Sequence, residues 1–203
     1  MSVVQFVMGE PRAVLALVRW IRGWRPPGEP ITHHRGVAGV LWVAVGLTVL
    51  EGAVFEIVLA AVLGDSVWVL VALALHVYGV FFLLALQACG VTRPHTVEPD
   101  RIVLRSGFST DVLIDRADVL DVHVGRYREY DGARGWRPSA DGTTATIAAG
   151  EANVEIRLGP GARVVVGGRS MADPPVAVYI TADEPRRFVR ALRGPSDRTS
   201  NLR

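Results

Sequence analysis

Two long apolar runs in the first half of the chain limit most strongly what it can fold into. They cover Gly36 to Leu63 and Val67 to Gly90, and only the tripeptide Gly64-Asp65-Ser66 separates them. Each run exceeds the roughly 20 apolar residues that a helix needs to cross a bilayer core. A buried helix of a soluble domain is rarely apolar on every side over such a length. The sequence therefore predicts a transmembrane helical hairpin over residues 36–91.

The composition agrees with one hairpin plus one small soluble domain. Half of the 203 residues are apolar and the mean hydropathy is +0.29, which is high for a soluble domain, while the length is short for a many-span transporter. The net charge of +2 gives no single-sign field suited to nucleic acid. All 22 basic residues are Arg, a usage typical of GC-rich bacterial genomes. The single cysteine, Cys89, excludes an intrachain disulfide and a thiolate metal cluster.

Residues 1–35 are predicted to form an arm with an amphipathic helix at about residues 11–24. Stepping 100° per residue places the large apolar side chains on one side and the arginines on the other. This pattern is typical of a helix lying in the membrane interface, and packing on the soluble domain is the alternative. The residues expected to contact the membrane interface are Arg12, Arg19, Arg22, Trp20 and Trp24.

The arginines also predict an orientation. They flank the hairpin on the side away from its turn, whereas the turn carries Asp65 and no basic residue. The positive-inside rule then places both termini in the cytoplasm. We expect a multi-pass protein of the bacterial plasma membrane.

Three ionisable residues lie inside the apolar runs. Counted from the turn at 1.5 Å per residue, Glu51 and His76 lie roughly 20 and 17 Å from the outer end, and Glu56 lies roughly 12 Å from it. A carboxyl group in mid-membrane is favoured when it is paired, so we expect an intramembrane polar cluster of Glu51, His76, Tyr78 and Thr48. Glu56 is about 140° round the helix from Glu51 and is expected to be a second acid facing a partner or another copy.

This cluster has three interpretations: a structural polar contact, a proton or ion site, and a metal site. Two metal ligands, one His and one carboxylate, fall short of the three or four that zinc requires. We therefore expect no metal and no cofactor. The structural contact is favoured. The other histidines, His33, His34, His95 and His123, are expected to be solvated or interfacial.

Beyond residue 93 the pattern changes to short alternating strands, which predicts a domain over residues 94–193. Residues 183–193 have the acids, proline and terminal arginines typical of a helix. The fold class is thus α+β: the hairpin plus a small all-β barrel or sandwich with one C-terminal helix. Residues 194–203 are expected to be a disordered tail. The predicted strands are 101–105, 108–114, 119–127, 143–149, 153–158, 163–166 and 176–181.

Two stretches of this region, VEPDRIVLRSGFSTDVLIDRADVLDVHV and ITADEPRRFVRALR, carry a family resemblance. They resemble the bacterial PH-like (pleckstrin-homology-like) domains that follow two membrane spans in uncharacterised actinobacterial proteins. The resemblance covers roughly Pro94 to Arg193. It implies a seven-stranded barrel closed by the last helix, and a role in interactions at the membrane. Phosphoinositide binding is not carried over, because the first hairpin offers only Arg105 beside its turn.

The common catalytic motifs for nucleotides, acyl transfer, zinc hydrolysis and dithiol redox are absent from the sequence. We therefore expect a non-enzymatic inner-membrane protein whose PH-like domain binds a protein partner or itself. Its expected partners also include the lipid bilayer, and exclude nucleic acid. The alternative is a proton- or ion-handling membrane component that uses Glu51 and His76.

Overall fold

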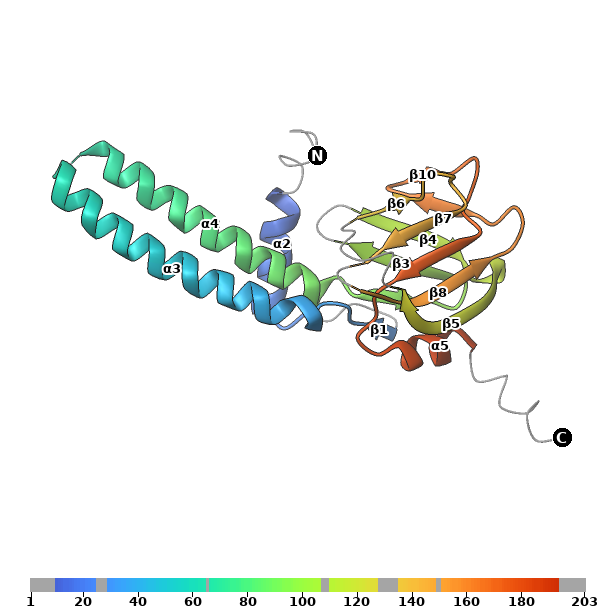
Figure 1. Cartoon of the computed structure of the whole chain (residues 1–203). Helices are drawn as coiled ribbons and strands as arrows, with labels where there is room; N and C mark the ends of the chain where they lie inside the picture. Colours follow the sequence, from blue (N-terminus) through green and yellow to red (C-terminus); the bar gives the residue numbers. More distant parts are fainter. Residues whose placement is uncertain are drawn as a thin grey trace.

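The computed structural model joins a long helical hairpin to a β-rich domain at one end (Figure 1). It describes residues 10–24, 29–64, 66–106, 110–127, 135–148 and 151–193. The predicted disordered tail, residues 194–203, lies outside this part of the chain.

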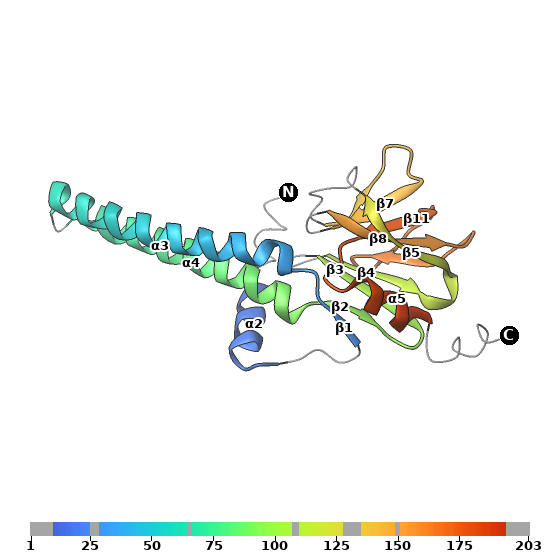
Figure 2. The same ribbon diagram turned by 60° about the horizontal axis from the view of Figure 1, so that its bottom comes forward.

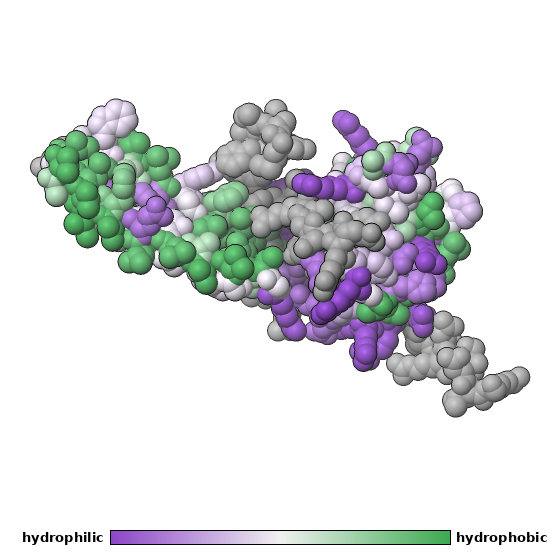
Figure 3. Space-filling view, in the orientation of Figure 1, coloured by the Kyte–Doolittle hydropathy of each residue, from purple (hydrophilic) through white to green (hydrophobic). Residues whose placement is uncertain are grey.

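The two apolar runs form the helices α3 (Arg35–Leu63) and α4 (Val67–Thr92), which pack as antiparallel neighbours. Ser66 caps α4 by accepting a hydrogen bond from the backbone N–H of Trp68. In the most apolar 18-residue window of each helix only 6% of the residues are buried, so the hairpin exposes an extended apolar surface (Figure 3). By length and composition both helices are long and apolar enough to cross a membrane.

The predicted amphipathic helix is α2 (Glu10–Ile21), which crosses the hairpin close to the β-rich domain (Figures 1 and 2). Ala16 packs against Ala88 and Cys89 of α4, and the small side chains let the two helices approach closely. The ring of Trp20 lies 6.4 Å from that of Trp42 on α3. The large apolar side chains that stay exposed on α2 are Val14, Leu15, Val18 and Ile21.

The β-rich domain consists of two sheets, and each of the seven predicted strands has a counterpart in them (Figure 2). The first sheet has the order β1 (Glu29–Ile31), β2 (His95–Val97), β3 (Arg101–Ser106), β4 (Thr110–Asp115), β9 (Val164–Val166) and β10 (Arg169–Ser170). The second has the order β5 (Val119–Tyr127), β8 (Ala152–Leu158), β11 (Ala177–Ile180), β7 (Thr144–Ile147) and β6 (Arg137–Pro138). A short 3-10 helix, Arg116–Asp118, leads from β4 to β5. All pairings are antiparallel except that of β7 with β11.

The core of the domain lies between the two sheets. Ile102 and Ile114 from the first sheet and Ile156 from the second are fully buried in one cluster. The helix α5 (Pro185–Arg193), at the predicted position, adds Phe188 and Leu192 to this cluster. The arrangement is a sandwich of two sheets with a helix against it, not the closed seven-stranded barrel that the resemblance implies.

Strand β1 joins the domain from the other side of the hairpin, which corrects the expected boundary at residue 94. It pairs with β2, with Ile31 opposite His95. Immediately after it, the Thr32 carbonyl accepts a hydrogen bond from the Asp183 N–H at 2.8 Å. The carboxylate of Asp183 in turn accepts hydrogen bonds from the backbone N–H groups of His34 and Arg35 at 3.2 Å. A carboxylate there is favourable because the first N–H groups of a helix lack intrahelical partners.

Two histidines expected to be solvated or interfacial are instead buried at this junction. The rings of His33 and His95 stack, with their centroids 4.2 Å apart and an interplanar angle of 14°. His95 Nδ1 accepts a hydrogen bond from the Arg105 N–H, so Nε2 is the nitrogen that donates to the Thr181 carbonyl. Burial lowers the pKa of His95 well below 6.5 and that of His33 to about 4. Both rings are therefore neutral near pH 7.

Asp183→Ala should lower the free energy of unfolding by about 1 kcal/mol, because it removes the cap of α3. Glu184→Ala is the matched control, since it removes two exposed ion pairs, to Arg35 and to Arg187, each at 3.6 Å, and should cost less than about 0.5 kcal/mol. Chemical denaturation of the purified full chain measures both. Equal losses would show that Asp183 does not act as a cap.

His33→Phe should make the chain less sensitive to acid. The unfolded chain binds a proton at His33 near pH 6.5 and the folded chain only near pH 4, so stability falls as the pH falls through this window. The loss at pH 5 amounts to about 2 kcal/mol. Phe keeps the stack on His95 without titrating, so the difference in stability between pH 8 and pH 5 should shrink by about that amount. An unchanged difference would contradict the assignment.

Candidate functional site

Inside the hairpin, His76 pairs with Glu56. His76 Nδ1 lies 3.4 Å from Glu56 Oε1 and 3.0 Å from the carbonyl of Ala72, one turn earlier on its own helix. Both carboxylate oxygens of Glu56 are buried. The His76 ring also lies 5.6 Å from that of Phe55. This is a polar contact across an otherwise apolar helix pair.

The structure differs here from the expected pairing of Glu51 with His76. His76 packs against Gly52, where an added Cβ would lie 3.0 Å from the ring, so His76 and Glu51 lie at about the same level along the hairpin. Glu51, however, is 100° round the helix from Gly52 and is exposed on the outside of the hairpin. Glu56 is one turn from Gly52 on the same face. A helical side chain also leans toward the N-terminus of its helix, which for His76 is the level of Glu56.

The other two members of the expected cluster separate in the same way. Thr48 faces the partner helix, since its methyl group would lie 3.8 Å from a Cβ added at Gly79. Tyr78 is 40% exposed, and its ring lies 6.4 Å from that of Phe81 on the same helix. The contact between α3 and α4 therefore contains Thr48, Glu56 and His76, while Glu51 and Tyr78 lie outside it.

The expected membrane-interface residues all lie on or just after α2, and they divide into two groups. Trp20 is half-buried against the hairpin, so part of its ring serves packing. Arg12, Arg22 and Trp24 are exposed. The guanidinium of Arg19 lies 4.6 Å from the centre of the Trp24 ring, a favourable cation–π contact.

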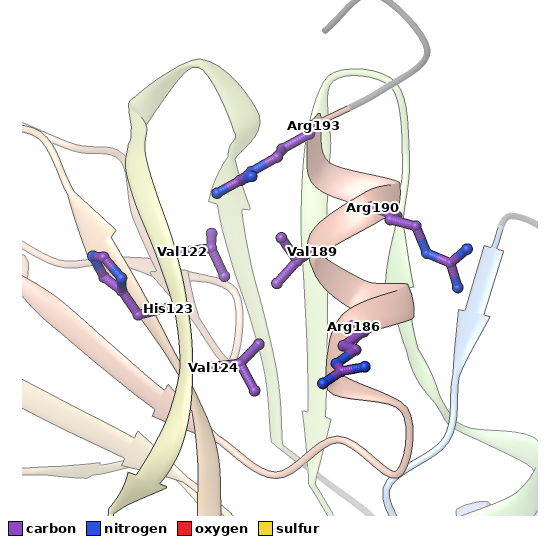
Figure 4. Close-up of a pocket in the computed structure, with 7 residues that line it drawn as sticks. All are labelled: Val122, His123, Val124, Arg186, Val189, Arg190 and Arg193. Carbon is purple, nitrogen blue, oxygen red and sulfur yellow. The ribbon is translucent and has the colours of Figure 1, made fainter. Parts of the chain in front are cut away.

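A second candidate site, not predicted from the sequence, is an open groove between β5 and α5 (Figure 4). Figure 4 shows Val122 and Val124 of β5 pointing toward Val189 of α5, so that apolar side chains form the floor. Arg193 extends across the gap toward β5, and Arg186 lies at the Val124 end. His123 and Arg190 complete the lining.

Arginines of α5 give the groove a positive charge, and Figure 4 shows Arg193 extending toward β5 and Arg190 pointing away from it. Arg186, Arg190 and Arg193 stand at positions i, i+4 and i+7, which a helix places in one stripe. The imidazole of His123 points away from α5 (Figure 4) and lies 2.8 Å from Asp121. The spacing of these arginines was the sequence feature that could have indicated the groove. Arginines are also usual in the last turn of a helix, so from the sequence they indicate only the end of the helix. The arrangement suits noncovalent binding of an anionic chain over an apolar floor.

In the described ranges, no three His, Cys, Asp or Glu residues lie close enough together to hold a metal ion. Comparisons of the chain with protein-family models, with curated proteins and with solved structures find no match. The geometry of the hairpin and of the groove thus provides the basis for a functional proposal.

Gly52→Leu should destabilise the hairpin, because its side chain would meet the His76 ring. Overpacking of this kind costs about 1–3 kcal/mol. Gly46→Leu is the matched control, since an added Cβ there meets nothing within 4 Å. Thermal unfolding of the two variants in detergent should give a lower midpoint for Gly52→Leu alone. Equal midpoints would contradict the close contact between Gly52 and His76.

Proposed function

We propose that this chain is a non-enzymatic membrane protein that presents a PH-like interaction domain on the cytoplasmic side of the bacterial plasma membrane. In this proposal α3 and α4 cross the bilayer, and the domain binds a protein partner or a second copy. The observation that carries it is the apolar surface of the hairpin, which ends where the polar domain begins (Figure 3). Such a surface is unfavourable in water and favourable in lipid.

The lengths of the helices support the bilayer placement. At 1.5 Å per residue, the 29 residues of α3 and the 26 residues of α4 extend about 43 and 39 Å, compared with a hydrocarbon core of about 30 Å. Trp42 near the domain end and Trp68 near the turn are both exposed, as aromatic residues at the two membrane interfaces would be.

Helix α2 supports the same placement. It crosses the hairpin near the domain, where the membrane interface would lie (Figures 1 and 2). Its exposed side, including the 75% exposed Ile21, would enter the acyl chains, and its arginines would meet anionic head groups.

The orientation follows from the charges at the two ends of the hairpin. Arg35 begins α3 and Arg93 ends α4, both next to the domain, and the arginines of α2 lie at this end too. The positive-inside rule favours the cytoplasm for this end. The PH-like assignment rests on the sequence resemblance, together with the two sheets and the terminal helix that follows them. Phosphoinositide binding is not proposed, since Arg105 donates to the Pro94 carbonyl at 2.8 Å instead of projecting as a free cation.

Proton or ion handling is the alternative function. With Glu51 outside the hairpin, it would use Glu56 and His76, which lie 3.4 Å apart. A proton path across the membrane needs further polar groups along the helix contact. The contact residues Gly52 and Gly79 offer none, and Thr48 adds a hydroxyl that is eight residues, about 12 Å along the axis, from Glu56. A contact that fixes helix pairing is therefore the better supported role.

Single cysteine reporters test the proposed topology. Ser66→Cys, in the turn of the hairpin, should react with a membrane-impermeant maleimide added to intact cells. Ser170→Cys, on an exposed strand of the domain, should react only after the cells are opened. The unmodified chain is the control, because its only cysteine, Cys89, is buried. The reverse pattern would reverse the orientation, and labelling of both reporters in intact cells would exclude the bilayer-spanning hairpin.

A further inference from the structure

We propose that two copies of this chain associate within the membrane along the outer side of α3, where the Glu51 side chains of the two copies hydrogen-bond to each other. The inference rests on the proposed function, in that α3 and α4 are taken to cross the bilayer, and it names a second copy as the partner of the hairpin. Three features carry it: an unpaired acid at mid-depth, an apolar seam around that acid, and an open side of α3.

The acid is Glu51. It lies 16 residues after Arg35 and 12 before Leu63, which is about 24 and 18 Å from the two ends of α3. Its side chain is exposed on the outside of the hairpin, and within the described part of the chain no hydrogen bond or ion pair reaches it. An unpaired carboxyl group in hydrocarbon is costly. Both ends of the helix are beyond the reach of a Glu side chain, so its partner has to lie at mid-depth too.

Apolar side chains surround Glu51 in the pattern by which membrane helices pack against each other. Spacings of four and three residues alternate along α3, and at 100° per residue these positions fall within about 80° of the helix circumference. In heptad terms Glu51 takes an a position, where a single polar residue specifies the register and the number of helices that pair. We call this set the Glu51 seam, and its large apolar members are between 55% and 70% exposed. It consists of Val40, Ala44, Leu47, Glu51, Val54 and Val58.

The Glu51 seam lies clear of the contacts that α3 makes within one copy. Gly52, which packs against His76 of α4, is 100° round the helix from Glu51. Trp42, whose ring lies 6.4 Å from that of Trp20 on α2, is nine residues from Glu51 and therefore about 180° away. Helix α2 thus approaches α3 from the opposite side. A further helix can contact the seam without displacing α2 or α4.

A second copy fits the seam because symmetry supplies the missing partner. Two copies inserted in the same orientation are related by a two-fold axis along the membrane normal, and residues beside that axis meet their own counterparts at the same depth. Glu51 of one copy would therefore meet Glu51 of the other. A protonated carboxyl group carries a hydroxyl donor as well as acceptor oxygens, so the two groups can exchange hydrogen bonds. A different membrane protein would need a polar group placed independently at this depth.

Cysteine cross-linking in cell membranes tests the face. Leu47→Cys lies in the Glu51 seam. Val49→Cys is the matched control, because it lies at nearly the same depth on another side of α3, with a similar exposed fraction of 53% compared with 59% for Leu47. A disulfide requires Cα atoms within about 7 Å, so copper phenanthroline should link Leu47→Cys into a dimer and leave Val49→Cys monomeric. The unmodified chain is the blank, since its only cysteine, Cys89, is buried.

Three results of the cross-linking would overturn the proposal. They are equal linking of both variants, no dimer from Leu47→Cys, and a link from Leu47→Cys to a different protein in place of the dimer.

Variants of Glu51 test the hydrogen bond between the copies. Copies labelled with donor or acceptor fluorophores at Ser170→Cys, reconstituted in phosphatidylcholine vesicles, report association by energy transfer as lipid is added. Glu51→Leu keeps the seam apolar and should weaken association by about tenfold, as expected for one lost hydrogen-bonded contact between membrane helices. Glu51→Gln keeps a donor and an acceptor and should change it less than about threefold. Equal or tighter association of Glu51→Leu would overturn the role of Glu51.

Two further measurements keep the conclusions separate. The thermal midpoint of Glu51→Leu in detergent should equal that of the unmodified chain, since Glu51 lies outside the contact between α3 and α4, and the cross-linking test does not depend on this variant. Carbonate extraction separates the proposals: release of the unmodified chain from membranes contradicts the membrane anchor and this association with it. Retention in the membrane without a Leu47→Cys dimer overturns the association alone.

Discussion

The pairing of β1 with β2 is the interaction on which the rest of the structure depends. The chain leaves the first sheet after Ile31, runs out along α3, returns along α4 and re-enters the same sheet at His95. Because strands from both sides of the hairpin pair with each other, the connections to the helices are only two or three residues long. The carboxylate of Asp183 closes the junction at α3, and Arg93 does so at α4 by pairing with Asp111 at 2.5 Å.

This junction fixes what the domain presents and where. The segment that holds Asp183 against α3 continues directly into α5, so the direction of that helix is tied to the direction of the hairpin. The arginine stripe of α5 then rises away from the hairpin instead of lying level with its end (Figure 1). In the proposed membrane placement, the domain would hold this stripe clear of the membrane surface.

Within the hairpin, the contact of Glu56 with His76 determines which sides of the two helices face each other. In the bilayer that we propose, two helices that are apolar on every side would gain little from turning one particular side toward each other, since lipid and neighbouring helix are equally apolar. A polar pair strongly favours the helix rotation that brings its two side chains together, because an unpaired carboxylate in hydrocarbon is costly. The close fit of His76 over Gly52 gives this preference a defined geometry. The pair thereby selects one rotation of each helix about its axis.

Local sequence signals determined the two apolar helices, seven of the described strands and the terminal helix, because periodicity and chain-breaking residues define each of them over a short stretch. Tertiary structure decided the short strands β1, β2, β6 and β10, none of which the sequence predicted. The pairing partner of β1, for example, follows the whole hairpin. It also decided that His76 meets Glu56 rather than Glu51. The level of a residue along a helix follows from counting residues. The rotation of a helix about its axis can be predicted only when one side is more apolar than the others, and these two helices are apolar on every side.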